Sequence, residues 1–345
     1  MNNIIIIKLA ALGDVLRTTC ILEGLHKKYR DASISWLTAK SALCLLENNP
    51  LIDSVFAIED SVSTELLRES YDLVISLDDE AAACNLATRL TTRKFFGAYH
   101  INDKTLYTDD SADWFDMSLI SVFGKVEADK RKKENQRSYP DILFHALGIT
   151  EGKPSLQLNP RNREFAQQFA RAHLSPGRLK IGLNTGAGNR WQFKQLSIPQ
   201  TIDIAEYFSL DPDKEILLFG GPAELQRNES IISNANCSII ETGTCNSINE
   251  FAALIGLCDL LITSDSLAFH IASAIGIPTI VFFGPTSSAE IHLFSSGNKI
   301  TSPLPCVCCY KKRCDFKPHC MDVIPTDEIL QIAEELLSTN KNRSE

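Results

Sequence analysis

Short runs of apolar, mostly β-branched residues alternate with helical patterns along almost the whole chain, and the alternation occurs in two successive sets. This pattern is typical of βαβ units, in which helices connect parallel strands. A first helix over 15–29 would carry its apolar residues on one face. Five strands are expected in each half, at 4–9, 33–37, 54–58, 73–77 and 94–97, and at 179–184, 215–219, 238–241, 260–263 and 279–283.

The pattern is interrupted over 150–178, where glycines and prolines that end helices and strands accumulate. A chain of 345 residues is also long enough for two domains, each with its own core. We therefore expect two Rossmann-like domains, residues 1–165 and 175–345. A last helix is predicted over 327–337, followed by a frayed tail.

Composition narrows the function classes. A chain with 44% hydrophobic and 22% charged residues is a folded protein rather than a disordered one. Its net charge of −9 argues against a general nucleic-acid partner. No apolar stretch approaches the roughly 20 residues that span a bilayer, and the first residues lack the basic start of a signal peptide. The sequence thus predicts a cytoplasmic protein, with one basic stretch over 125–137 that we expect to be a loop.

The first strand is followed by a turn that contains Gly13 and Asp14. Open α/β sheets bind ligands at the carboxyl ends of their strands, which is where this turn lies. It is not a dinucleotide fingerprint, because G-x-G-x-x-G is absent. Asp14 has two interpretations, an ordinary N-cap of the following helix or a general base at the mouth of a cleft.

Two turns of the second half have the composition of anion- or sugar-binding loops. The stretch 184–194 contains closely spaced glycines, whose backbone N–H groups can approach an anion, and ends at Lys194, which is either a phosphate ligand or a solvated charge. In the turn Gly220-Gly221-Pro222-Ala223-Glu224, the glutamate either favours the helix dipole or accepts two hydroxyl hydrogen bonds from a ribose.

The most specific segment begins at Asp265-Ser266-Leu267 and continues to Gly284-Pro285-Thr286. It predicts a strand, an acidic turn, a helix and a second strand. The helix start at 266–268 would present N–H groups and a positive dipole end to a diphosphate. His270, on the apolar face, is on its own more typical of a core residue.

Five of the eleven cysteines lie between Cys306 and Cys320. In a reducing compartment such clustering favours metal binding over disulfides. A C-x₂-C-x₄-C-x₅-C set suits tetrahedral zinc or iron, and free packed thiols are the alternative. The four candidate ligands are Cys306, Cys309, Cys314 and Cys320.

Taken together, these segments resemble the family-9 glycosyltransferases, the bacterial heptosyltransferases of lipopolysaccharide core assembly. The shared motifs are K-L-x-x-L-G-D-V-L, T-G-A-G…K, D-S-x-x-x-H, F-G-P-T and the late C-Y-K-K-x-C run. The resemblance implies an α/β protein of GT-B fold, with two Rossmann-like domains whose parallel sheets face each other across a cleft. It implies inverting transfer of heptose, or a related sugar, from an ADP-sugar to a core acceptor without a catalytic metal.

The resemblance also implies roles for individual residues. Asp14, beside Gly13, matches the catalytic base, and Lys194 with the helix start at Ser266 would stabilise the departing diphosphate. Leu267 stands where the family usually has glycine, and a leucine does not readily adopt positive φ. The other matches are Thr185 and Gly186 in the phosphate loop, Glu224 at the ribose, Asp265, Ser266 and His270 in the D-[TS]-G-x-x-H motif, and Gly284 and Thr286 in the nearby wall.

The implied partners are an ADP-sugar and a lipid-linked oligosaccharide, with peripheral contact to the cytoplasmic face of the inner membrane and no nucleic acid. The basic stretch would suit a phosphorylated acceptor, although a solvated loop explains it equally well. A subgroup of the family that modifies autotransporter proteins is associated with iron at the cysteine run. Alternative functions are another GT-B enzyme, such as a sugar-nucleotide epimerase, or a non-catalytic nucleotide-sugar-binding protein. The candidate acceptor-binding residues are Lys130, Arg131, Lys132 and Lys133.

Overall fold

The computed structural model describes residues 2–60, 63–188, 192–311 and 313–344. The chain forms two compact units. Unit 1 consists of Met1–Gln157 together with Ala289–His292, and unit 2 consists of Leu158–Ser288 and Leu293–Glu345. The short segment Ala289–His292 joins unit 1 through a bond from the Tyr139 N–H to the Glu290 carbonyl, 2.9 Å long.

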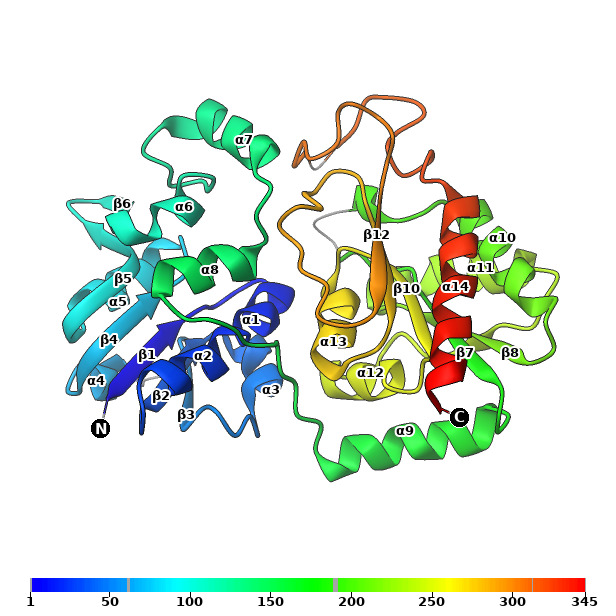
Figure 1. Cartoon of the computed structure of the whole chain (residues 1–345), viewed down its shortest axis with the longest axis horizontal. Helices are drawn as coiled ribbons and strands as arrows, with labels where there is room; N and C mark the ends of the chain where they lie inside the picture. The colour runs from blue at the N-terminus through cyan, green and yellow to red at the C-terminus, as the bar shows by residue number, and fades with distance from the viewer. Residues whose placement is uncertain (1, 61–62, 189–191, 312, 345) are drawn as a thin grey trace. The chain divides into compact units, whose positions relative to one another are not determined.

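Unit 1 is built on a six-stranded sheet in the order β3-β2-β1-β4-β5-β6 (Figure 1). All neighbouring strands are parallel except β5 and β6, which are antiparallel. The strands are β1 (Asn3–Ile7), β2 (Ser33–Thr38), β3 (Ser54–Ala57), β4 (Ser70–Ser76), β5 (Thr91–Ile101) and β6 (Lys104–Tyr107). The helices are α1 (Leu12–Thr18), α2 (Ile21–Lys28), α3 (Leu43–Leu46), α4 (Ser63–Leu66), α5 (Ala81–Arg89), α6 (Ala112–Phe115), α7 (Gly124–Glu134) and α8 (Tyr139–Leu147).

The composition of β1 accounts for its central position in this sheet. Four consecutive isoleucines, residues 4–7, are fully buried. A parallel strand covered by helices on both faces is apolar throughout rather than alternating. Ile7 pairs with Leu37 of β2 on one side and Ser76 of β4 on the other. The turn that leaves β1 therefore starts from a rigid, fully paired strand.

The prediction of a single helix over 15–29 is wrong, because α1 and α2 are separated at Thr19 and Cys20. A later segment of the chain crosses this break. The backbone of Gly152 lies so close that a Cβ there would be 1.9 Å from the Cys20 carbonyl oxygen, and the Ser155 N–H donates to the Thr19 hydroxyl at 2.9 Å. These contacts favour two short helices over one continuous helix.

The basic stretch over 125–137, predicted as a loop, is largely helical and forms α7. Only Ala128 of this helix is buried. Because α7 has no apolar stripe to pack on a core, the periodicity that normally indicates a helix is missing from its sequence. Figure 1 shows α7 standing away from the sheet of its unit.

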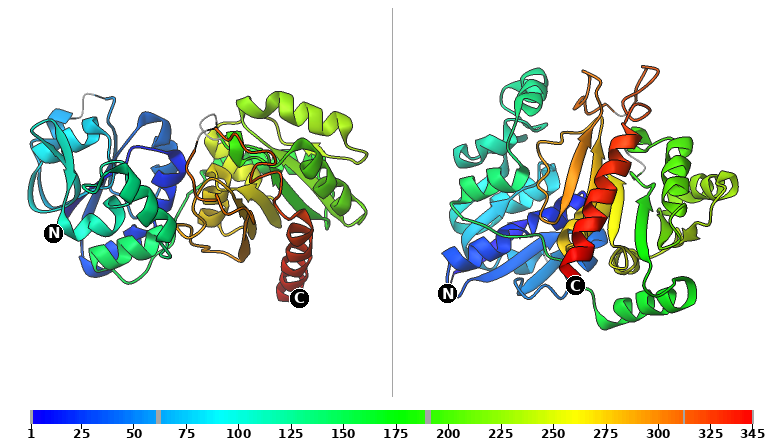
Figure 2. Two further views of the ribbon diagram at one scale, coloured as in Figure 1. Left: turned by 90° about the horizontal axis from the view of Figure 1, so that it is seen from above. Right: turned by 45° about the vertical axis from the view of Figure 1, so that its right-hand side comes forward.

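Unit 2 repeats the plan with a parallel sheet in the order β12-β11-β10-β7-β8-β9. Helix α14 packs against β10, β11 and β12, as the right-hand view of Figure 2 shows. The strands are β7 (Leu179–Asn184), β8 (Lys214–Phe219), β9 (Ile240–Glu241), β10 (Leu260–Ser264), β11 (Thr279–Phe283) and β12 (Gly297–Thr301). The helices are α9 (Pro160–His173), α10 (Ile198–Ser209), α11 (Leu225–Asn234), α12 (Ile248–Ile255), α13 (Leu267–Ile275) and α14 (Thr326–Ser344).

All ten predicted strands are present, with ends shifted by a few residues. The sequence did not indicate β6 and β12, two edge strands. In β12 only Ile300 is fully buried, so an edge strand of this kind lacks the apolar run that marks a central one.

The last helix is longer than predicted and reaches Ser344. The prediction of a frayed tail after residue 337 is therefore wrong. In the part of the chain that the structure describes, no helix combines the length and the apolarity needed to cross a bilayer.

Candidate active site

Both sheets reverse their strand order beside the first strand, between β1 and β4 in unit 1 and between β7 and β10 in unit 2. Such switch points create the crevice in which open α/β sheets bind ligands. Asp14 follows β1, Thr185 follows β7, and Asp265 follows β10. The candidate residues of both units thus lie at the carboxyl ends of strands that flank a switch point.

Asp14 is the third residue of α1. The N-cap of this helix is Ala11, and no side chain caps it, so the interpretation of Asp14 as an N-cap is wrong. The Asp14 side chain is 35% exposed, and its Oδ1 lies 2.9 Å from Nη2 of Arg17, one turn further along the helix. This carboxylate is therefore open to solvent and held in place from one side, as a general base requires.

Arg17 is held by aromatic rings that the sequence analysis did not connect with it. Its guanidinium carbon lies 4.1 Å from the ring centroid of Tyr139 and 5.6 Å from that of Trp114. The two rings contact each other edge to face at 4.5 Å, and the Tyr139 hydroxyl lies 2.8 Å from the Thr18 hydroxyl. Stacking on aromatic faces restrains the planar guanidinium, which in turn orients Asp14.

In unit 2 the loop after β7 is tied to the end of β10 by Asn184. Its amide nitrogen lies 2.9 Å from the Gly186 carbonyl oxygen, 2.9 Å from Thr263 Oγ1 and 3.3 Å from Ser266 Oγ. One side chain thereby fixes the loop that follows β7 relative to the start of α13. The sequence places Asn184 in this loop without indicating a role, since Thr263 and Ser266 lie far along the chain from it.

Two further contacts shape this loop. The Thr185 hydroxyl lies 2.6 Å from the Oδ1 of fully buried Asn228, so it supports the loop from below. The buried Glu224 carboxylate accepts from the Gly221 N–H at 3.0 Å and from Gln195 Nε2 at 3.2 Å. It also lies beside Gly186, where a Cβ would be 3.4 Å from Glu224 Oε2. The predicted ribose and phosphate residues are therefore neighbours.

Lys194, Asp265 and His270 form a buried charge network. Lys194 Nζ lies 2.8 Å from Asp265 Oδ2 and 2.9 Å from its carbonyl oxygen, and His270 Nε2 lies 3.8 Å from Asp265 Oδ1. Burial by itself would raise the pKa of the Asp265 carboxyl, but Lys194, His270 and the Thr286 hydroxyl outweigh it and hold that pKa well below its usual range. Asp265 is therefore ionised at neutral pH and fixes the lysine ammonium.

Helix α13 begins directly after this network. Its N-cap, Ser266, has extended backbone, and Leu267 is the first helical residue. Leu267 is not among the described residues with positive φ, so the leucine in place of the family's glycine causes no backbone strain. The N–H groups of the first turn still carry the positive end of the helix dipole.

The cysteine segment supports the turn at Gly284 and Thr286. The Cys308 N–H donates to the Gly284 carbonyl at 2.9 Å, and the Tyr310 N–H donates to the Pro285 carbonyl at 2.8 Å. A Cβ on Gly284 would lie 2.5 Å from Cys320 Sγ and 2.8 Å from Met321 Sδ. The cysteine segment is thus packed against the turn that contains Gly284, Pro285 and Thr286.

The four predicted metal ligands are near one another without forming a closed site. Burial, helped by neighbouring Cys309, Cys314 and Cys306, raises the pKa of the Cys320 thiol to about 11. Among the described residues, no group of three or more His, Cys, Asp or Glu side chains is arranged to hold an ion. The cysteines of this part of the chain are free thiols.

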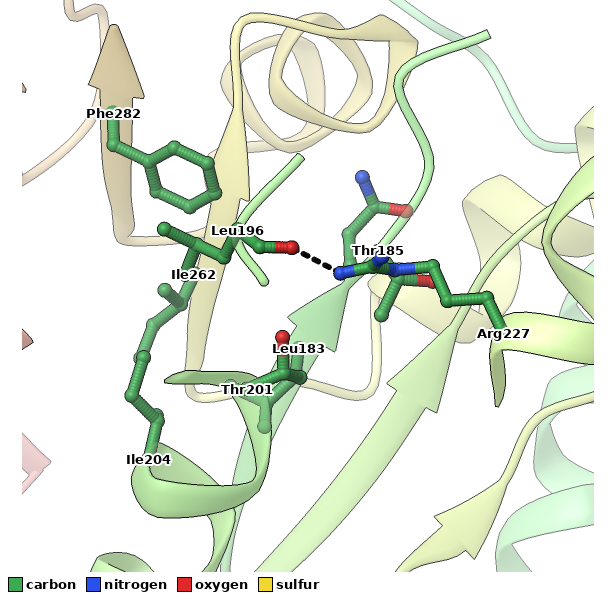
Figure 3. A pocket seen from close by; sticks show the side chains of 9 residues that line it. Leu183, Thr185, Leu196, Thr201, Ile204, Arg227, Ile262 and Phe282 are labelled. Carbon is green, nitrogen blue, oxygen red and sulfur yellow. Dashed lines mark hydrogen bonds between the residues drawn. The ribbon is translucent and has the colours of Figure 1, made fainter. Parts of the chain in front are cut away.

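A small pocket opens beside Thr185, and Figure 3 shows the residues that line it. Arg227 reaches into this pocket from α11, and its Nη2 donates to the Leu196 carbonyl. Burial lowers the pKa of the Arg227 guanidinium, although Glu224 opposes the effect. Five of the other lining residues are apolar, and the polar ones are Asn184, Thr185 and Thr201.

The candidate acceptor residues lie on α7 of unit 1. Arg131 is already occupied, with Nη1 3.1 Å from Asp116 Oδ2 and Nε 3.3 Å from Glu127 Oε1. Lys130 has a long contact of 4.0 Å with Glu127, and Lys133 is exposed.

Some residues of the predicted segments lie outside the described residues. They are Asn189, Arg190 and Trp191 of the loop over 184–194, and Lys312 of the cysteine run.

Comparison with known proteins identifies the family. Residues 61–319, about three quarters of the chain, match the model of glycosyltransferase family 9 (heptosyltransferase). The chain belongs to this family. It is 23% identical to lipopolysaccharide heptosyltransferase 1 of Campylobacter coli over 97% of this chain and 98% of that protein. This confirms the family resemblance, and the chain is a glycosyltransferase.

Solved structures of the family share the fold. The family-9 glycosyltransferase of Veillonella parvula has a TM-score of 0.77, with 21% identity over 98% of this chain and 97% of that one. The iron-containing heptosyltransferase TibC of enterotoxigenic Escherichia coli, in its complex with ADP-D-beta-D-heptose, has a TM-score of 0.58, with 12% identity over 99% of this chain and 78% of that one. The prediction of an α/β, GT-B-type protein is confirmed.

Proposed function

We propose that this glycosyltransferase transfers heptose, or a related sugar, from an ADP-sugar to a lipopolysaccharide-core acceptor and inverts the anomeric configuration. The observation that carries the proposal is the buried network of Lys194, Asp265 and His270 at the start of α13. It combines a fixed cation with a helix N-terminus, which is the arrangement that stabilises a departing diphosphate.

Unit 2 would hold the donor. The Lys194 ammonium, whose position is set by two bonds to Asp265, would meet the diphosphate oxygens together with the N–H groups after Ser266. The loop at Thr185 and Gly186 would line the phosphates, and the adjacent Glu224 carboxylate would accept hydrogen bonds from ribose hydroxyls. Gly284 and Thr286 would close the wall of this site.

Unit 1 would supply the base and hold the acceptor. The Asp14 carboxylate would remove the proton of an acceptor hydroxyl as that oxygen attacks the anomeric carbon. The bond from this carbon to the ADP oxygen breaks, and its electron pair leaves with the diphosphate. Because the nucleophile attacks opposite the leaving group, the configuration is inverted. Arg17 would keep the carboxylate aimed at the hydroxyl.

The acceptor is proposed to be a phosphorylated, lipid-linked oligosaccharide at the cytoplasmic face of the inner membrane. Lys130, Lys132 and Lys133 of α7 are suited to its phosphates. Arg131 would act on the acceptor only by supporting α7, because its guanidinium is bound by two carboxylates.

A structural zinc or iron ion is proposed at the cysteine segment, outside the transfer step. Four thiols within a short segment are a suitable donor set, and the neighbours of Cys320 are the other three predicted ligands. The arrangement described above would have to close further around an ion. Stoichiometric zinc or iron in protein purified without added metal supports this, and its absence with rapid alkylation of Cys306 and Cys309 refutes it.

Incubation of the purified protein with ADP-heptose and a panel of core acceptors, followed by mass spectrometry, tests the proposed function. We expect an acceptor heavier by one heptose and release of ADP. Donor consumption without any acceptor would instead indicate a sugar-nucleotide epimerase. Tight ADP binding with no transfer to any acceptor would indicate a non-catalytic nucleotide-sugar-binding protein.

A further inference from the structure

Unit 1 carries a concentration of exposed apolar side chains next to α7. Val126 is 88% exposed, Leu119 78%, Val122 64% and Phe123 51%. These four lie within eight consecutive residues, whereas exposed apolar residues are normally scattered singly over a surface. We call these four residues the apolar patch. Apolar side chains gathered in this way are typical of a surface that contacts a partner or a membrane.

The patch is held in an ordered position by internal contacts. The Val122 N–H donates to the Tyr107 hydroxyl at 3.1 Å, and that hydroxyl donates to Asp116 Oδ1 at 2.7 Å. The Arg131 guanidinium covers one face of the Phe123 ring, 4.0 Å from its centroid. These bonds keep the segment outward-facing, so the exposure of the patch is built into the fold of unit 1.

The charge around the patch favours an anionic partner. Helix α7, GKVEADKRKKE, has five basic and three acidic residues, in a chain whose net charge is −9. Two of the acidic residues are paired within the helix, Asp129 with Lys125 at 2.5 Å and Glu127 with Lys130 at 4.0 Å. Lys133, in the last turn, is exposed. Apolar side chains bordered by lysines match the interface of an anionic bilayer, where the former enter the acyl boundary and the latter meet lipid headgroups.

We infer that the apolar patch, together with the lysines of α7, is a docking surface for an anionic lipid bilayer. The inference deepens the proposed function and rests on it for its biological setting, since a lipid-linked acceptor is met at such a surface. A protein partner would recognise the flanking lysines through a few individually placed acidic groups. An anionic bilayer instead presents negative charge over its whole surface, which suits several lysines along one helix. Neither donor nor acceptor is needed for the docking itself.

Co-sedimentation with vesicles tests the inference. We expect the full chain to sediment with vesicles of phosphatidylglycerol and phosphatidylethanolamine, less so at high salt, and only weakly with phosphatidylcholine alone. The double variant L119E/V126E should bind the anionic vesicles at least about tenfold more weakly, because two apolar contacts become charges. Lys133→Gln should weaken binding about fivefold, as expected for the loss of one positive charge at the headgroups.

Leu210→Glu is the matched control. Leu210 is 82% exposed and follows α10 in unit 2, so this variant introduces one of the two charges at a similarly exposed leucine elsewhere and should bind vesicles like the wild type. Equal vesicle binding by L119E/V126E and the wild type overturns the inference, and so does a wild type that ignores anionic vesicles. Self-association that the double variant abolishes, without vesicle binding, also overturns it, since the patch is then a contact between copies.

Transfer to a delipidated acceptor separates this inference from the proposed function. At saturating concentrations of that acceptor the double variant should reach the wild-type kcat, because the patch contacts lipid and not the reacting sugar. If the wild type transfers to no acceptor at all, the proposed function fails while the sedimentation result stands.

Discussion

The Asp14 carboxylate lies 2.9 Å from the Arg17 guanidinium, which in turn lies 4.1 Å from the centroid of the Tyr139 ring. The aromatic contact restrains the arginine that holds the carboxylate. In chemical terms Arg17 is a positioning residue, since the proposed base acts on the acceptor and the arginine acts through the base. Substitution of Arg17 should therefore affect the chemical step more than the binding of the donor.

Arg17→Gln should lower kcat by about a hundredfold and leave the KM for the ADP-sugar almost unchanged, because a base that is misplaced by a fraction of a bond length loses its alignment. Arg17→Lys should recover part of this loss, since an ammonium restores the charge but not the planar stacking. Arg137→Gln is the control, because the Arg137 side chain pairs with Asp113 at the surface. A change in donor KM with unaltered kcat would show that Arg17 acts on the donor instead.

Asp14→Asn should fold and bind ADP as the wild type does but lose about 10² to 10⁴ in transfer rate, the usual contribution of a general base. Circular dichroism and ADP titration check the fold and the donor site, and single-turnover transfer measures the chemical step. Turnover near the wild-type rate would exclude Asp14 as the base.

Asp265→Asn should destabilise unit 2 by about 3 kcal/mol, because the buried Lys194 ammonium then loses its ion pair with the Asp265 carboxylate. Urea unfolding measures this loss. The pKa of Asp265 is lower in the folded chain than in the unfolded one, so its stabilising contribution is complete above about pH 5 and is lost as the pH falls below roughly 4. The stability of the wild type should therefore decline more steeply in acid than that of the variant. Parallel acid profiles would contradict the assignment.

Gly284→Ala should lower stability by about 1 to 3 kcal/mol, since the new methyl group would overlap Cys320 Sγ and Met321 Sδ. The double variant G284A/C320A should recover part of the loss, because the nearest sulfur atom is removed. Thermal unfolding of both variants measures this. Losses that simply add in the double variant would show that the methyl group does not press on Cys320.

The strands were predictable because their physical signal is local. The isoleucines of β1 and the residues of β10 and β11 are buried throughout, and a run of apolar, β-branched residues records that burial directly. Helix α7 was missed for the opposite reason, since it packs almost nothing on the core. Its helical backbone is supported instead by pairs such as Lys125 with Asp129 on its own surface.

The site was predictable only where a motif lies in one stretch of sequence. The turns that carry Asp14, Lys194 and Asp265 could be located at strand ends, although their roles remain predictions. The positions of Arg17 and Asn184 depend on partners in other elements, such as Tyr139 and Thr263. A single sequence contains no local pattern that connects such pairs.

The segment Ala289–His292 belongs to unit 1, although the chain on both sides of it belongs to unit 2. The two halves of the enzyme are therefore not separable by one cut at residue 157. Exchange of the proposed acceptor-binding half between relatives, in evolution or in the laboratory, would have to transfer this short return segment together with the first half. A chimera that leaves it behind would deprive the Tyr139 N–H of its Glu290 acceptor and disturb the ring on which Arg17 rests.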